Sequence, residues 1–372
     1  MGQKEKEKGM VITKDIVTPL LSWYQENKRI LPWRENKEPY RVWVSEIMLQ
    51  QTRVEAVKPY FDRFMKALPT VDALAMAEEE RLLKLWEGLG YYNRAKNLQK
   101  AARIIMDEYK GRFPNSFQQL IALPGIGAYT AGAIASISFE QPVPAVDGNV
   151  LRILSRLLCY EEDVLSKKAK DDAADALSSL MPKERSGDFN QALMELGATV
   201  CLPNGMPKCE GCPWQKLCLS YEKGCFLDYP KKSPKKSRKV EKLTVLVIGD
   251  GKKLLLHKRQ EKGLLAGMYE LPMLEGHLDE QAILDKVRDL GFSPIRIRKT
   301  NSAKHIFTHK EWHMEGYCIL TEPEETLPAK LQEDKGYVFA SLKEVKKDYP
   351  IPSAFDAFRK YFAMYPFMKE FV

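Results

Sequence analysis

Two helix-like stretches are joined by residues 123–130, Leu-Pro-Gly-Ile-Gly-Ala-Tyr-Thr. Gly125 and Gly127, spaced by one residue, allow left-handed backbone and a close approach of the backbone to another molecule. They also leave free N–H groups at the start of the following helix, and such groups bind phosphate oxygens. The same pattern is typical of a tight corner between two helices with a capping glycine. Residues 123–130 therefore predict a helical hairpin that is a candidate phosphate-binding element.

Outward from this hairpin, the chain changes character near residue 228. Apolar residues recur at helical spacing in 41–68, 78–86, 94–109, 117–122, 129–138, 149–158, 168–180 and 189–200. After residue 242 the pattern favours strands at 243–248, 254–258, 296–298, 306–309, 312–320 and 337–339, with helices at 279–290 and 354–364. A chain of 372 residues also exceeds one ordinary core. We expect a mainly α domain at 1–228, a linker at 229–242 and an α/β or α+β domain at 243–372.

The positive charge of the chain is concentrated in the expected linker. The chain has 58 Lys and Arg against 50 Asp and Glu, a net charge of +8. Residues 231–242 contain seven basic residues and one acidic residue, so six of the eight excess positive charges lie there. This segment is either a solvated linker or one that also touches a polyanion.

The N-terminal residues and the lengths of the apolar runs indicate the cellular compartment of the protein. No apolar run approaches the length of about 20 residues that a membrane span needs. Residues 1–8 are polar, with no apolar stretch behind them that is typical of a secretory signal. We expect an intracellular, cytoplasmic protein with no membrane partner.

Four of the seven cysteines crowd into residues 201–218; they are Cys201, Cys209, Cys212 and Cys218. In an intracellular chain this density predicts a metal centre rather than disulfides. Structural zinc usually shows two Cys-x-x-Cys pairs, and this array has one, so a [4Fe–4S] cluster is favoured over zinc. Cys225 is a nearby spare thiol that complicates the choice of ligands.

Two carboxyl groups stand in contrasting surroundings. Asp147 is placed where a new helix begins, which suits an ordinary N-cap as well as a functional anion. Glu46 shares its helix face with apolar Val42 and Leu49, so burial is expected to raise its pKa. The alternative is a glutamate at the rim of the core, paired with an arginine.

A protonated acid and a nearby anion together form the arrangement that cleaves glycosidic bonds. The acid activates the leaving group, and the anion stabilises the oxocarbenium ion. The phosphate-binding hairpin and the aromatic residues Trp33, Tyr91 and Tyr92 indicate that the glycoside is a nucleotide in DNA.

The chain resembles the adenine DNA glycosylases of the MutY family, in the helix-hairpin-helix superfamily that also contains endonuclease III. The resemblance rests on the four cysteines and on residues 31–34, 43–52, 88–95, 123–130 and 146–150. It implies a helix-hairpin-helix glycosylase domain with a [4Fe–4S] cluster that excises adenine opposite 8-oxoguanine or guanine in double-stranded DNA; we expect a monomer. The family has six residues between the first two cysteines and this chain has seven; the added residue can bulge outward in 202–208.

Residue roles also follow from the resemblance. Glu46 would protonate adenine N7, and Asp147 would stabilise the sugar cation. The implied catalytic group is Glu46, Asp147, Tyr129 and Asn149. The implied adenine pocket consists of Arg29, Leu31, Trp33, Arg34 and Gln191. The implied DNA contacts are Gln51 and Tyr91 as wedges, Thr52 at the opposite purine, and Gly125 and Gly127.

The second domain resembles the Nudix-like domain of the same glycosylases from residue 263 onward. A Nudix hydrolase holds magnesium with a glutamate-rich helix, and residues 282–290 lack those glutamates, so pyrophosphatase activity is not expected. In the family a Phe-Ser-His turn inspects oxidised guanine. The matching residues here are Phe307, Thr308 and His309, and Thr308 keeps the hydroxyl. The alternative is a strand end, with threonine present for its β propensity.

Two rival functions fit the hairpin and the cysteines. A bifunctional glycosylase/lyase like endonuclease III needs a lysine just after the hairpin. Tyr129 stands there, and no lysine occurs between Lys110 and Lys167. A non-enzymatic iron–sulfur DNA sensor has no need of both carboxyls. The sequence therefore favours a monofunctional glycosylase.

Overall fold

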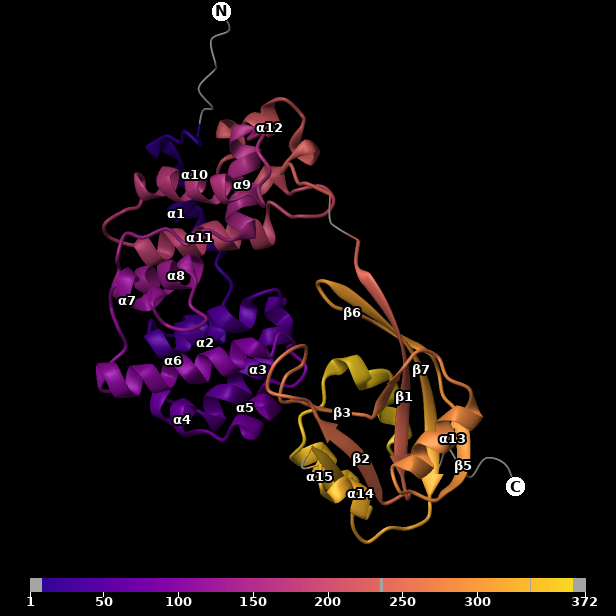
Figure 1. The fold of residues 1–372 in the computed structure, drawn as a ribbon. Coiled ribbons are helices and arrows are strands. Elements are labelled where there is room, and N and C mark those ends of the chain that lie inside the picture. Colours follow the sequence, from indigo (N-terminus) through magenta and orange to yellow (C-terminus); the bar gives the residue numbers. More distant parts are fainter. Residues whose placement is uncertain (1–8, 235–236, 335, 364–372) are drawn as a thin grey trace, which may run out of the picture. The chain divides into compact units, whose positions relative to one another are not determined.

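The computed structural model describes residues 9–234, 237–334 and 336–363. By their internal contacts these residues form two compact units, one of 9–76 with 97–234 and one of 77–96 with 237–334 and 336–363 (Figure 1). Lys235 and Lys236 of the expected linker lie outside the described residues, as does the end of the helix expected at 354–364.

The first unit is helical. Its helices are α1 (Val17–Asn27), α2 (Pro39–Leu49), α3 (Val54–Ala67), α4 (Val71–Met76), most of α6 (Asn93–Tyr109), α7 (Phe117–Ile121), α8 (Ala128–Phe139), α9 (Gly148–Leu158), α10 (Lys167–Ser178), α11 (Ser186–Thr199) and α12 (Leu219–Glu222). The continuous helix expected over 41–68 is wrong. The chain turns between α2 and α3, where Gln51 adopts a left-handed φ of 59°.

The core of the first unit joins helices from both ends of its sequence. Leu154 of α9, Leu20 of α1 and Phe189 of α11 are fully buried in one cluster. Burial of such side chains stabilises the fold by about 1.5–3 kcal/mol each. Trp214, in the cysteine-rich loop, is buried in the same cluster, and its Nε1 donates to the Ile16 carbonyl at 2.9 Å. The cysteine loop is therefore anchored on the core that positions α9.

The predicted hairpin is present between α7 and α8. Gly125 has a φ of +77°, and a Cβ there would lie 2.6 Å from the Asn97 Cβ, so the turn requires glycine. Gly127 has an ordinary φ of −91° and is the N-cap of α8. Only the first of the two glycines uses the left-handed region.

The second unit is built on an eight-stranded sheet within its described residues. The strands are β1 (Lys239–Gly249), β2 (Lys253–Lys258), β3 (Tyr269–Glu270), β4 (Met273–Glu275), β5 (Pro294–Lys299), β6 (Ala303–Ile306), β7 (Lys310–Thr321) and β8 (Tyr337–Ser341). The order is β3-β2-β1-β7-β5, with β4 paired to β1, β6 to β7 and β8 to β2. The β1–β7 pair is parallel and the other pairs are antiparallel. The expected mixed α and β architecture is confirmed.

Both faces of this sheet are covered. Along β1, Val245 and Val247 face one apolar cluster, whereas Leu246 and Ile248 face another, as the two-residue period of a strand requires. The first face packs on the 3₁₀-helix Ser353–Tyr361 and the second on α13 (Glu280–Asp289). The helix expected at 354–364 is thus a 3₁₀-helix as far as it is described. The short helices α14 (Ala329–Gln332) and α15 (Leu342–Lys347) complete the unit.

Residues 77–96 belong to the second unit by their internal contacts, and polar contacts also tie α5 (Glu79–Trp86) and the residue after it to the chain around the sheet. Lys84 Nζ donates to the Tyr349 carbonyl at 3.0 Å. Lys258 Nζ pairs with Glu80 at 2.7 Å, and Arg359 pairs with Glu87 at 2.5 Å. This grouping differs from the expected boundary at residue 228, and β1 also begins inside the segment expected to be linker.

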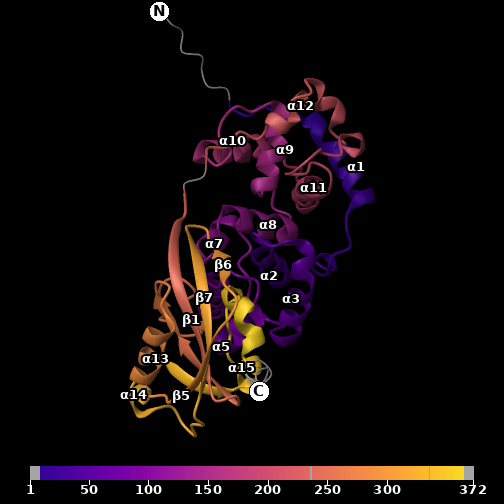
Figure 2. The ribbon, with the colours of Figure 1, turned by 90° about the vertical axis from the view of Figure 1, so that its right-hand side faces the viewer.

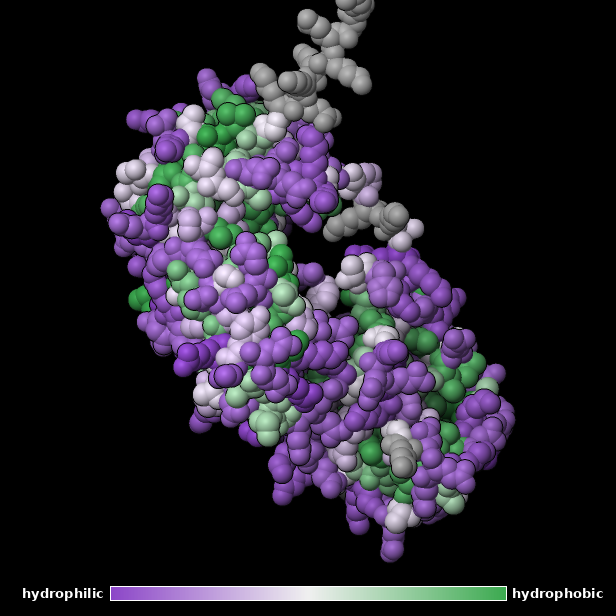
Figure 3. Space-filling model, turned by 60° about the vertical axis from the view of Figure 1, so that its left-hand side comes forward, coloured by the Kyte–Doolittle hydropathy of each residue, from purple (hydrophilic) through white to green (hydrophobic). Residues whose placement is uncertain are grey.

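The face drawn in Figure 3 is mostly hydrophilic, with small apolar areas scattered over it. In the described part of the chain, no helix combines the length and the apolar character that a membrane span demands.

Candidate active site

A cleft of about 600 Å³ opens in the first unit between α2, α8, α9 and α11, the elements grouped in Figure 2. The cleft is lined by many of the residues that the sequence predicted at the site, namely Arg29, Leu31, Trp33, Arg34, Glu46, Gln51, Thr52, Tyr129, Asp147, Asn149 and Gln191. The hairpin glycines are not part of this lining, and Tyr91 and residues 307–309 belong to the second unit. The structure therefore gathers the expected catalytic group and adenine pocket in one place.

Glu46 is buried on α2, with 6% of its surface exposed. The Tyr129 hydroxyl donates to Glu46 Oε2 at 2.6 Å. Burial raises the pKa of Glu46 to about 7; the Asp147 charge adds to the rise, whereas the Tyr129 hydrogen bond and the Arg34 charge oppose it. The raised pKa expected from the apolar helix face is confirmed. The hydrogen-bond partner is a tyrosine hydroxyl, and Arg34 acts only through its charge.

Asp147 caps the N-terminus of α9. Its Oδ1 accepts from the backbone N–H groups of Asn149 and Val150, both at 2.8 Å, and its Oδ2 accepts from Asn149 Nδ2 at 2.7 Å. Burial raises the pKa of Asp147, and these three donors oppose that shift. The aligned peptide dipoles of α9 also favour an anion at this end. The N-cap interpretation is correct, and the cap faces the cleft.

Arg152 links the Asp147 end of α9 to the cysteine loop. Its Nη2 donates to Asn149 Oδ1 at 3.1 Å and to the Gly197 carbonyl at 2.7 Å, and its Nε donates to the Cys201 carbonyl at 3.0 Å. A Cβ at Gly197 would lie 2.7 Å from the Asn149 Cβ, so glycine lets α11 approach α9 here. The sequence analysis missed Arg152; its spacing of three residues from Asn149 on a helix was the available signal.

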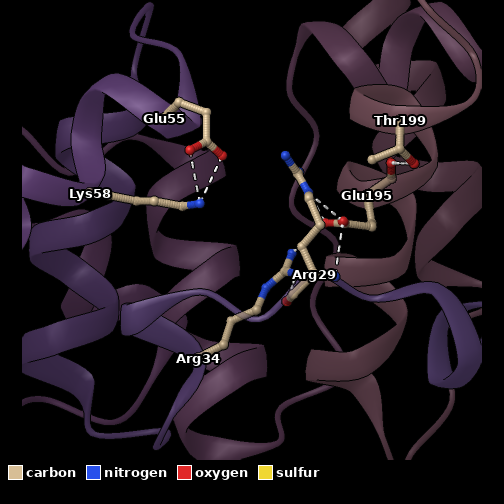
Figure 4. Close-up of polar contacts among 6 residues, drawn as sticks. All are labelled: Arg29, Arg34, Glu55, Lys58, Glu195 and Thr199. Carbon is tan, nitrogen blue, oxygen red and sulfur yellow. Dashed lines mark hydrogen bonds and ion pairs between the residues drawn. The ribbon is translucent and has the colours of Figure 1, made fainter.

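Glu195 forms a second buried polar group in the cleft that the sequence analysis missed. Arg29 Nε contacts its Oε1 at 2.6 Å and Arg34 Nη2 its Oε2 at 2.8 Å, and Figure 4 shows both guanidinium groups turned toward this carboxylate. Burial alone would raise the pKa of Glu195, but the two arginines lower it below its usual value. An ionised carboxylate therefore fixes the two arginines expected in the adenine pocket.

The four cysteines of the array face one small cavity of about 30 Å³. Arg156 also lines it, and its Nη1 donates to Cys201 Sγ at 3.3 Å. Cys225, the spare thiol, is not part of the lining. Residues 203–206 of the longer loop are exposed, so the added residue has room. Among the described residues, no His, Cys, Asp or Glu side chains are gathered in threes or more as a single metal ion would need.

Residues 307–309 form the turn between β6 and β7. The strand expected at 306–309 is wrong, because β6 ends at Ile306 and the Phe307 N–H donates to the Lys310 carbonyl at 2.8 Å. The Phe307 ring packs edge-on against Trp312 with centroids 4.8 Å apart, whereas Thr308 is exposed. The Thr308 hydroxyl lies 3.3 Å from the hydroxyl of Tyr91, which has a left-handed φ of 49°. Two expected DNA contacts thus meet inside the second unit.

Residues 44–182 match the HhH-GPD superfamily base excision DNA repair proteins, and residues 244–361 match the NUDIX domain. The adenine DNA glycosylase of Mus musculus is 36% identical over 369 residues, which covers 83% of this chain and 72% of that protein. The chain belongs to the adenine DNA glycosylase family. The adenine DNA glycosylase of Buchnera aphidicola subsp. Schizaphis graminum is 36% identical over 301 residues, covering 81% of this chain and 85% of that protein.

Similarity to a solved structure of another DNA glycosylase agrees with this assignment. A solved structure of a thermostable thymine-DNA glycosylase has a TM-score of 0.50 and 29% identity, covering 56% of this chain and 96% of that protein. The helical part of this adenine DNA glycosylase family member therefore has a glycosylase fold. The family and the fold class expected from the sequence are both confirmed.

Proposed function

We propose that this chain is a monofunctional DNA glycosylase that removes adenine mispaired with 8-oxoguanine or guanine, acting as a monomer on double-stranded DNA in the cytoplasm. The observation that carries the proposal is the pair of carboxyls in one cleft. Glu46 has a pKa of about 7, and Asp147 is hydrogen-bonded by three donors at a helix N-terminus. A neutral acid and a nearby anion are the two groups that glycosidic bond cleavage needs.

Each carboxyl has a distinct task in this mechanism. Protonated Glu46 donates to a ring nitrogen of adenine, N7 by the family resemblance, so that the base leaves without negative charge. The Tyr129 hydroxyl at 2.6 Å orients that carboxyl. Asp147 faces the sugar, where positive charge develops as the bond breaks. Water then adds to the sugar and leaves an abasic site.

The walls of the cleft suit a base that has been turned out of the duplex. Leu31 and Trp33 are buried and supply apolar surface, whereas Arg29 and Arg34 supply donors held in place by Glu195. Enzymes that act on a base need such a pocket, because the reacting atoms are out of reach inside the helix.

This function is tested by measuring whether the DNA strand stays intact after adenine has been removed. The protein is incubated with a duplex carrying one adenine opposite 8-oxoguanine, and we expect free adenine and a strand that breaks only after alkali. The reason is that the position after the hairpin is Tyr129, which forms no Schiff base. Strand cleavage without alkali, or efficient trapping of a protein–DNA adduct by borohydride, would show a lyase instead.

The proposal includes a [4Fe–4S] cluster held by Cys201, Cys209, Cys212 and Cys218. The donor set fits a multi-iron cluster rather than one metal ion, because the four thiols line one cavity without gathering at a single point, and Arg156 places a cation beside Cys201. When bound, the cluster supplies four metal–thiolate bonds that fix the loop. Arg152 and Arg156 then connect the fixed loop to α9.

Iron content distinguishes the ligands from the spare thiol. Cys212→Ser removes a thiolate from the cavity, so we expect it to lower the iron bound per chain and the brown colour of the protein. Cys225→Ser is the matched control and is expected to leave both unchanged, because Cys225 does not line the cavity. Metal analysis of the wild-type protein that finds zinc and no iron would contradict the cluster.

The proposal also makes the turn at 307–309 a reader of the base opposite adenine. Oxidised guanine carries a proton on N7 where guanine has an acceptor. A hydroxyl can accept from that N–H, whereas toward guanine it can act only as a donor. The exposed Thr308 hydroxyl, presented by a turn that Phe307 anchors on Trp312, suits this task.

Thr308→Val keeps the shape of the side chain and removes the hydroxyl. We expect it to narrow the preference for adenine opposite 8-oxoguanine over adenine opposite guanine by about 5- to 30-fold, since one lost hydrogen bond costs about 1–2 kcal/mol. Single-turnover excision on the two duplexes measures the ratio of their rates. Thr308→Ser is the control, because it keeps the hydroxyl and is expected to keep the wild-type ratio. An unchanged ratio of excision rates in Thr308→Val would show that the Thr308 hydroxyl takes no part in lesion recognition.

A further inference from the structure

Two cysteines outside the array lie next to one another. The Sγ atoms of Cys159 and Cys225 are 3.8 Å apart, and both residues are free and half-buried. Neither lines the cavity of the four-cysteine array. The seventh cysteine, Cys318, is buried on strand β7 of the second unit. With the array occupied by metal, Cys159 and Cys225 are therefore the two accessible thiols of the chain.

The backbone on both sides of this pair is held by hydrogen bonds. Cys159 ends α9, and its N–H donates to the Ser155 carbonyl. The Cys225 N–H donates to the Ser220 carbonyl at 2.9 Å, and Ser220 lies in α12. The views in Figure 1 and Figure 2 both place α12 beside α9, and the two helices are in contact.

Arg156 ties the two segments together. From α9, its Nε donates to the carbonyls of Phe226 and Tyr229, both at 3.0 Å. Phe226 directly follows Cys225 in the chain. The separation of the two sulfur atoms is thus set by a hydrogen-bonded framework that includes the residues on either side of the pair.

We propose that Cys159 and Cys225 form a reversible disulfide, a redox site separate from the cleft and from the four-cysteine array. A disulfide needs an S–S distance of about 2.05 Å, so the sulfurs must approach by about 1.8 Å, and we expect rotation about the two Cα–Cβ bonds to supply this movement. The inference goes beyond the proposed function, because it requires neither base excision nor a particular metal.

The oxidant is a small-molecule disulfide. One cysteine thiolate attacks a sulfur of the small disulfide, forms a mixed disulfide and expels one thiolate. The second cysteine thiolate attacks the protein sulfur of that mixed disulfide and expels the other. The protein loses two electrons and two protons, and the small disulfide is reduced to two thiols, so the reaction is balanced.

The new bond would close a loop that contains the whole cysteine array. It would connect the C-terminal end of α9 to the segment that directly follows the array, and both ends are already in place in the reduced protein. A cross-link in a framework that needs little movement stabilises the fold by limiting the unfolded chain. We therefore expect the oxidised protein to melt several degrees higher than the reduced protein.

Mass spectrometry after oxidation is the test. The full-length, metal-loaded protein is incubated with oxidised glutathione, its remaining thiols are alkylated, and the digest is searched for linked peptides. We expect a Cys159–Cys225 link, a mass lower by two hydrogen atoms, reversal by a reductant, and a rise in Tm. Cys318→Ser is the matched control and should behave as wild type.

Single substitutions complete the test. Cys159→Ser and Cys225→Ser are each expected to give only a glutathione adduct on the remaining thiol, with no rise in Tm. Recovery of both thiols in alkylated form from the treated wild-type protein would overturn the proposal. So would a link from either cysteine to Cys218 or another member of the array. Because neither excision nor metal content is read out, failure of the disulfide is distinguishable from failure of the proposed function.

Discussion

Asp147→Asn is expected to lower the single-turnover rate of adenine excision by about 10²–10³-fold, the usual cost of removing one charge-stabilising group. The variant loses the anion that faces the developing sugar cation. Its fold should persist, because an asparagine oxygen can still accept from the backbone N–H groups of Asn149 and Val150. Excision is measured on a duplex with adenine opposite 8-oxoguanine, and affinity for that duplex is measured alongside.

Asp279→Asn is the matched control for this variant. Asp279 is also an N-cap, of α13 in the second unit, where its side chain accepts from the Ala282 N–H. The same chemical change at this cap should leave excision unaltered. If Asp147→Asn excises adenine at a near-normal rate while binding DNA normally, Asp147 has no electrostatic part in the reaction.

Glu46→Gln is expected to slow excision by about 10²–10⁴-fold, because an amide of the same shape cannot give a proton to adenine. The Tyr129 hydroxyl can still donate to the amide oxygen, so the cleft should keep its geometry. Glu55→Gln is the control, since Glu55 is an exposed glutamate on α3 whose partner is Lys58, as Figure 4 shows. Comparable losses of excision rate in Glu46→Gln and Glu55→Gln would indicate a general effect of removing a negative charge, not the loss of a proton donor.

Local patterns in the sequence predicted the parts of the site that depend on local physics. The glycine pattern predicted the hairpin, and the apolar face around Glu46 predicted its raised pKa. The position of Asp147 before a helical stretch predicted a cap. Each of these properties leaves a pattern within about one helical turn in the sequence, although the contacts that complete it, such as Tyr129 with Glu46, come from distant residues.

Contacts between distant residues could not be predicted in the same way. Glu195 is 166 residues from Arg29 in the chain, and nothing in its local sequence indicates that two arginines face it. The contact between Cys159 and Cys225 spans 66 residues. Helical spacing shows which face of α9 is buried, but not which loop packs on it.

The errors of the sequence analysis have local causes as well. Gln51 takes a left-handed conformation that favours glycine, so the break between α2 and α3 had no glycine or proline to mark it. Thr308 has the β propensity of a strand residue but lies in a turn. Residues 77–96 read as ordinary helix, and only their contacts with distant parts of the chain, such as the pair of Glu80 and Lys258, group them with the sheet.

The dependence of excision on pH tests most directly the claim that Glu46 is the proton donor. The acid must be protonated, and its pKa is about 7 in the free protein. The single-turnover rate of the wild-type protein should fall about tenfold per unit above that pH, and below it should stay level only while Asp147, whose own pKa is raised by burial, remains ionised. Nearby DNA phosphates would move the turning point upward. Glu46→Gln should be slow and show no such fall. A wild-type rate that is flat or rises between pH 6 and 9 would contradict the account.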